Sequence, residues 1–88
     1  MAIELEHDRF ADVLYVSTAG RHWHKSRLSD DDYYVIYEMD KSLKVVGLTL
    51  LDASHITSDE WHSSRVEQEA GEPLYDAVAR WIRKRENL

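Results

Sequence analysis

Two histidines, His22 and His24, have a spacing that could hold a metal ion. Residues i and i+2 of a β-strand point to the same side, so the two imidazoles would supply two ligands for zinc or nickel. A third ligand would have to come from His55, His62 or the three acids at 30–32. A metal held there could support hydrolysis. Two solvated histidines on an edge strand explain the same spacing, and we favour that interpretation.

Carboxylates and hydroxyls offer a second route to chemistry. Asp8 and Asp12 could form an acid/base pair, as could Asp52 beside Ser54. Short polar side chains in these contexts more often close turns, and we predict that role for both pairs. No serine lies in a G-x-S-x-G elbow, and three glycines are too few for a phosphate-binding loop. The chain has no cysteine, which excludes thiol catalysis and disulfides. The sequence favours a non-enzymatic protein without a cofactor.

The charge balance limits the classes of partner. The 88 residues include 17 acids and 11 lysines and arginines, for a net charge of −6. A dedicated nucleic-acid binder would normally carry a basic face, so no nucleic-acid partner is expected. The basic stretch Arg80 to Arg85 could contact RNA, but basic residues in the last turn of a helix are explained by the helix dipole. No apolar run is long enough to span a membrane, and no secretory signal begins the chain. A cytoplasmic protein is expected.

The first part of the chain is typical of β-strands. Alternating apolar and acidic residues, and later β-branched and aromatic residues, are separated by polar turns. The predicted strands cover residues 3–6, 13–18, 22–28 (an irregular or edge strand), 33–39 and 45–51. The last two form a hairpin around residues 40–44, where no Gly or Asn supplies a positive φ. Asp40 and Ser42 could hold a type I turn there through local hydrogen bonds.

The second part is helical. Thr57 and Glu60 fit a capping box, which predicts a helix over about 58–65. Pro73 suits the first turn of a further helix. Its apolar stripe consists of Leu74, Ala77, Val78, Trp81 and Ile82. The predicted fold is one α+β domain, residues 1–88: a small antiparallel sheet of four to five strands in 1–56, with helix or helices in 57–88 packed on one face.

Three segments together resemble a bacterial family catalogued as domain of unknown function 2283. They are Ala11-Asp12-Val13-Leu14-Tyr15-Val16 after Asp8, then Tyr34-Val35-Ile36-Tyr37, then Val46-Gly47-Leu48-Thr49-Leu50-Leu51-Asp52-Ala53-Ser54. The resemblance covers about residues 3–56. It implies a compact sheet domain without known catalytic residues, of a kind that can be encoded beside toxin-like proteins. An antitoxin-like, partner-binding role is therefore one expectation from the resemblance. Relatives usually carry Gly where this chain has Leu43, and often Pro after the first Asp, where it has Arg9.

The strands carry apolar residues on both sides. Leu14, Val16, Val46, Leu48 and Leu50 are expected to meet the final helix, whereas Val13, Tyr15, Val45 and Leu51 lie on the opposite side. That side needs another cover, which could be the remaining helix or a partner. Tyrosine and tryptophan are enriched at interface cores. We therefore predict a partner-binding face, for self-association or a small partner protein, made of Tyr15, Trp23, Tyr33, Tyr34 and Tyr37, although an aromatic core would use the same residues.

Overall fold

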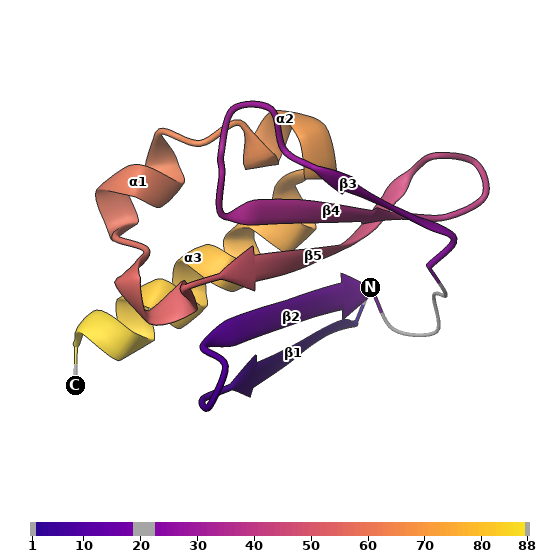
Figure 1. Ribbon diagram of the computed structural model, residues 1–88. Coiled ribbons are helices and arrows are strands. Elements are labelled where there is room, and N and C mark those ends of the chain that lie inside the picture. Colours follow the sequence, from indigo (N-terminus) through magenta and orange to yellow (C-terminus); the bar gives the residue numbers. More distant parts are fainter. Residues whose placement is uncertain (1, 19–22, 88) are drawn as a thin grey trace.

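A single five-stranded antiparallel sheet forms one layer of the protein, and three helices form the other (Figure 1). The computed structural model describes residues 2–18 and 23–87. The strands are β1 (Ile3–Asp8), β2 (Val13–Thr18), β3 (Lys25–Leu28), β4 (Val35–Met39) and β5 (Val45–Leu51), in the spatial order β1-β2-β5-β4-β3. The predicted α+β class is confirmed. The third predicted strand is an edge strand, shorter than expected.

The helices follow the sheet in the chain and cover one of its faces. They are α1 (Ser58–His62), α2 (Val66–Ala70) and α3 (Glu72–Glu86), preceded by the 3-10 turn η1 (Ala53–His55). The capping box at Thr57 is present: its hydroxyl accepts the N–H of Glu60, whose carboxylate accepts the N–H of Thr57. Pro73 lies in the first turn of α3. No helix in the described residues is long and apolar enough to cross a membrane.

The core lies between the helices and one face of the sheet. Pairing of Leu14 with Leu50, and of Val16 with Leu48, places four fully buried side chains at the centre of that face. The helices contribute seven more core residues, Trp61, Val66, Leu74, Tyr75, Ala77, Val78 and Ile82. The other members of the core are Tyr34, Val35, Tyr37, Ala53 and Ile56. Trp61 stacks on Tyr75 and donates its indole N–H to the Tyr75 carbonyl at 3.1 Å. The predicted stripe of α3 therefore packs against the sheet, with Trp81 half-buried at its margin.

A β-bulge changes the expected alternation at the start of β5. Glu38 pairs with Gly47, but the next residue of β4, Met39, pairs with Val45, so Val46 is the extra residue. A bulge interrupts the two-residue period of side-chain direction. Val45 consequently packs against the helix-side core, and its predicted place on the opposite side was wrong.

Three predicted element ends were also wrong. The first strand, predicted over residues 3–6, continues to Asp8. The fourth strand begins at Val35 and not at residue 33, because residues 32–35 form a turn closed by the Val35 N–H and the Asp32 carbonyl. The helix predicted over 58–65 ends at His62, where the Ser64 hydroxyl bonds to the Trp61 carbonyl. A separate short helix, α2, follows it and was not foreseen.

The hairpin between β4 and β5 closes through an unusual residue choice. Asp40 Oδ1 accepts the backbone N–H groups of Ser42 and Lys44, at 2.9 and 3.0 Å. Leu43 then takes a left-handed conformation with φ 64°. Asp40 holds the turn as predicted, and the position that needs a positive φ is the one at which the resembling family usually has glycine.

Candidate functional site

The sheet face that points away from the helices is not covered by any helix of the described residues, and we call it the outer face (Figure 1). Strand register defines its members. They are Glu4, Glu6 and Asp8 of β1, Val13, Tyr15 and Ser17 of β2, Gly47, Thr49 and Leu51 of β5, Ile36 and Glu38 of β4, and Ser26 and Leu28 of β3. Trp23, just before β3, lies over the same face.

Exposed apolar side chains run across the middle of the outer face. Tyr15 is 38% exposed, Trp23 48% and Leu28 59%. Ile36 pairs with Leu28 in the strand register and is half-buried. Single exposed apolar residues are ordinary on a protein surface, but several on one sheet face make that face a candidate interaction surface.

Gly47 allows Trp23 to lie close to the sheet. A Cβ atom at this position would stand 2.9 Å from the Val16 carbonyl oxygen and 3.4 Å from the Trp23 indole nitrogen. Because the space above Gly47 is occupied by the ring and the neighbouring strand, any side chain there would force one of them to move. The glycine therefore positions an aromatic anchor of the outer face.

A buried carboxylate lies at the centre of this face. Glu38 is 4% exposed, although it points to the same side as Tyr15. Its oxygens accept hydrogen bonds from the hydroxyls of Ser26 and Thr49, the latter at 3.2 Å. Two neutral donors from the flanking strands satisfy a charge that would otherwise be costly to bury.

The electrostatic character of the outer face is uniformly acidic. Glu4, Glu6 and Asp8 are exposed along its β1 margin, and Glu38 lies at its centre. None of the outward positions of the five described strands carries lysine or arginine. A binding partner would have to supply the opposite charge.

The structure divides the five predicted partner-binding aromatics into three groups. Tyr15 and Trp23 lie on the outer face, as described above. Tyr33 is exposed in the turn before β4, edge-on to Tyr34. Tyr34 and Tyr37 belong to the core, at 6% and 0% exposure, so their predicted place on a partner face is corrected. The helices and the 29–33 loop cover them, which strand periodicity alone does not indicate.

Burial changes the chemistry of these two tyrosines. Desolvation raises the pKa of Tyr37 to about 12 and moves the pKa of Tyr34 further in the same direction. The Tyr34 hydroxyl has no hydrogen-bond partner in the described part of the chain. Neither phenol is therefore an available acid or base at neutral pH.

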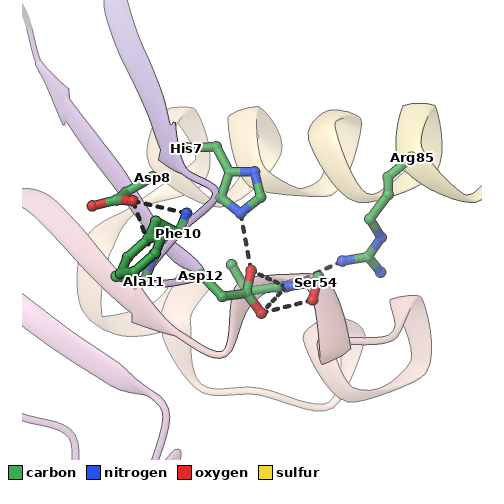
Figure 2. Close-up of polar contacts among 8 residues, drawn as sticks. His7, Asp8, Phe10, Ala11, Asp12, Ser54 and Arg85 are labelled. Atoms are coloured by element: carbon green, nitrogen blue, oxygen red, sulfur yellow. Dashed lines mark hydrogen bonds and ion pairs between the residues drawn. The ribbon is translucent and has the colours of Figure 1, made fainter.

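A second cluster of polar side chains joins the β1–β2 turn to η1 (Figure 2). Asp12 Oδ1 lies 2.9 Å from His7 Nε2, and Asp12 Oδ2 accepts the Ser54 hydroxyl at 2.6 Å. The Ser54 N–H also bonds to this carboxylate, and the Ala53 N–H bonds to the Asp12 carbonyl. Arg85 of α3 donates to the carbonyls of Ala53 and Ile56.

The Asp12 cluster is built for structure and not for catalysis. In a serine hydrolase the imidazole lies between the serine and the carboxylate, but here the carboxylate lies between Ser54 and His7. The Ser54 hydrogen bond, with a smaller contribution from His7, lowers the pKa of Asp12, which makes it a weaker base. The predicted turn-closing role of Asp12 and Ser54 agrees with these contacts. Asp8 also closes the turn, by accepting the N–H groups of Phe10 and Ala11.

Two further predictions from the sequence concern a metal site at His22 and His24 and the basic stretch at residues 80–85. His22 lies outside the described residues, so the His22–His24 metal hypothesis stays a prediction. Within residues 2–18 and 23–87, no cluster of three or more His, Asp or Glu side chains is arranged to hold a metal ion. In the basic stretch at 80–85, Arg85 is turned inward onto η1 and Trp81, whereas Arg80, Arg83 and Lys84 are exposed.

Comparison with known proteins gives no relative. No protein-family model, no curated protein and no solved structure matches this chain. The resemblance of residues 3–56 to the bacterial family therefore stays a prediction, and function has to be argued from the surface of the molecule.

Proposed function

We propose that this protein is a non-enzymatic interaction module whose outer face binds a partner protein carrying basic and apolar side chains. The observation that supports it most directly is that exposed aromatic and aliphatic residues lie beside an acidic margin on one sheet face, which no helix of the described residues covers. Aromatic anchors supply most of the affinity in such interfaces, and charge complementarity supplies specificity and the rate of association.

The division of roles follows from the positions of the residues. Tyr15, Trp23 and Leu28 form the apolar centre, and an aromatic or aliphatic side chain of the partner packs on them. Glu4 and Glu6 lie at the margin, where lysine or arginine of the partner reaches them. The bonds from Ser26 and Thr49 hold the carboxyl group of Glu38 in place beneath this centre.

A second copy of this chain is the other candidate occupant. Each copy carries a net charge of −6, so two copies repel each other, and two acidic outer faces offer no compensating cations. A basic partner is the better match. A small toxin-like protein, the kind encoded beside some members of the resembling family, is a partner of suitable size.

The test is native mass spectrometry of untagged protein purified from its natural host at low salt. We expect a basic polypeptide to accompany the wild-type protein and to dissociate as the salt concentration rises. Leu28→Glu and Tyr15→Glu should abolish the complex. Phe10→Ser, which removes an exposed aromatic residue outside the outer face, is the matched control and should retain it.

Two outcomes would overturn the proposal. One is a protein that elutes alone at low salt with no bound polypeptide. The other is a complex that Leu28→Glu and Tyr15→Glu leave intact, because the outer face would then not be the binding surface. If the wild-type protein instead forms a symmetric homodimer that both variants abolish, the outer face is still the binding surface, but its partner is a second copy of the chain.

A further inference from the structure

Phe10 is an exposed aromatic residue that the fold presents on a fixed turn. Its side chain is fully exposed, at 102% of the reference value, in the β1–β2 turn (Figure 2). Asp8 Oδ1 holds the turn by accepting the N–H groups of Phe10 and Ala11, at 3.0 and 3.1 Å. The Asp12 cluster anchors the other side of the turn to η1. A phenyl ring that is fully exposed among the described residues is thus held in a defined place.

An apolar cavity lies at the opposite end of the sheet. It has a volume of about 220 Å³ and lies between the first residues of β5 and the junction of α2 with α3. Its walls are mostly apolar, and two polar residues complete its lining. The lining residues are Val45, Val46, Ala70, Gly71, Pro73 and Leu74, with Thr18 and Lys44.

The size of the cavity suits one aromatic side chain. A cavity of about 150 Å³ lined by apolar side chains can hold a benzene ring. Pockets for drug-sized ligands start at about 300 Å³. The observed volume falls between the two, as expected for a phenyl ring with its methylene group.

The ring and the cavity cannot meet within one copy of the chain. Phe10 lies before the first residue of β2, whereas Thr18, at the cavity, is the last residue of that strand. A strand of this length spans about 20 Å. Any contact between the two features therefore needs a second copy.

Charges around the two features are complementary. Arg9 is exposed beside Phe10, and Glu72 is exposed between the cavity residues Gly71 and Pro73. Lys44 lines the cavity and is exposed, and the exposed Asp8 belongs to the turn. Each side thus offers one cation and one anion to the other.

We propose that Phe10 of one copy inserts into the cavity formed by β5, α2 and α3 of the next, so that the protein assembles head to tail. This contact uses none of the apolar residues of the outer face and shares only Asp8 with its acidic margin. The contact is heterologous, because its two parts, the Phe10 side chain (the knob) and the cavity, lie on different surfaces of the protein. Each assembly therefore has a free knob at one end and a free cavity at the other. One aromatic side chain buries about 150–250 Å², far less than a stable interface, and the net charge of −6 on each copy opposes the contact, so association is weak.

The test follows backbone amide resonances by NMR from micromolar to millimolar protein, with sedimentation velocity for mass. Wild-type protein should show concentration-dependent shifts at Val45, Val46 and Gly71 and a rising average mass. Phe10→Ser should stay monomeric over the whole range, with no such shifts. Leu28→Glu, which changes the outer face, should associate as the wild type does.

A mixing experiment tests the head-to-tail geometry. Phe10→Ser keeps the cavity without the knob, and Ala70→Leu keeps the knob with a filled cavity, its fold being checked by circular dichroism. Each variant alone should be monomeric, and a mixture should form a one-to-one dimer that grows no further. N-acetylphenylalanine amide, which needs no cavity variant, should shift the same three amides of Phe10→Ser.

The proposal fails if wild-type protein stays monomeric at millimolar concentration, or if Phe10→Ser associates like wild type. It fails as well if N-acetylphenylalanine amide leaves the cavity amides unchanged. Because Leu28→Glu and Phe10→Ser have opposite expected effects on the two contacts, loss of either contact is distinguishable from loss of the other.

Discussion

Replacing Leu43 with glycine should stabilise the protein. Leu43 holds φ 64° in the β4–β5 turn, a conformation that costs a non-glycine residue about 1–2 kcal/mol. Its side chain is 62% exposed, so little apolar burial is lost on substitution. Glycine gains conformational freedom in the unfolded chain, which takes back about 0.5–1 kcal/mol. The expected net increase in the free energy of unfolding is about 0.5–1 kcal/mol.

Urea unfolding monitored by tryptophan fluorescence measures this change directly. In a domain of this size a stabilisation of about 0.5–1 kcal/mol raises Tm by roughly 2–8 °C. Leu43→Ala is the matched control, because it removes the same apolar atoms but keeps the Cβ that makes the positive φ costly. We expect the alanine variant to lie within a few tenths of a kcal/mol of wild type, about as stable. A glycine variant no more stable than the alanine variant would refute the backbone argument.

Three further predictions concern substitutions at Gly47, at the tyrosines Tyr34 and Tyr75, and at Asp12. Gly47→Ala should lower the free energy of unfolding by about 1–3 kcal/mol in urea titrations, because its Cβ would stand 2.9 Å from a main-chain oxygen of β2. Tyr34→Phe should leave the free energy of unfolding unchanged or raise it by up to about 1 kcal/mol, because it removes a buried hydroxyl without a hydrogen-bond partner among the described residues. Tyr75→Phe, the comparison, should lower it by about 1 kcal/mol, because it removes the hydrogen bond between the Tyr75 hydroxyl and His62. The pKa of Asp12 in the folded protein lies below its ordinary value of 3.8. Its contribution to stability is therefore complete above pH 3.8 and is lost as the pH falls through the folded pKa. In acid titrations, the free energies of unfolding of wild type and Asp12→Asn should become equal at the lowest pH. Convergence at neutral pH would contradict that.

Local sequence patterns predicted the elements whose causes are local. Alternation in Ile3–Glu6 and the β-branched run at 13–18 mark β1 and β2, and the stripe from Leu74 to Ile82 marks the face of α3. The capping box at Thr57 and the proline of α3 could also be predicted from the sequence, because each acts within one helical turn.

Features that depend on distant contacts were not predictable in this way. The strand order, with β2 beside β5, depends on which hairpins pack against each other, and no local sequence pattern indicates it. The bulge at Val46 reversed the side of Val45. Burial of Tyr34 and Tyr37 depends on helices that follow later in the chain. For the candidate site, Tyr15 and Trp23 were identified from residue type, whereas the exposure of Leu28 and Phe10 was not.

The bond between Asp12 and Ser54 illustrates why such contacts escape sequence reasoning. Both residues looked like turn formers, and both are, but they close the same structure from positions far apart in the chain. The only available signal was the left-handed tendency of aspartate, which Asp12 and Asp52 both realise, with φ values of 56° and 50°.

The strand order also has a kinetic consequence. β1 with β2, and β3 with β4 and β5, each assemble from neighbouring segments, whereas the join between β2 and β5 pairs residues as distant in the chain as Val13 and Leu51. Closing that long loop costs chain entropy before any contact at the join compensates for it. The two strand groups should therefore form early and dock late. In native-state hydrogen exchange the β1–β2 hairpin should then open from β5 as one cooperative unit, before either strand group loses its internal pairing.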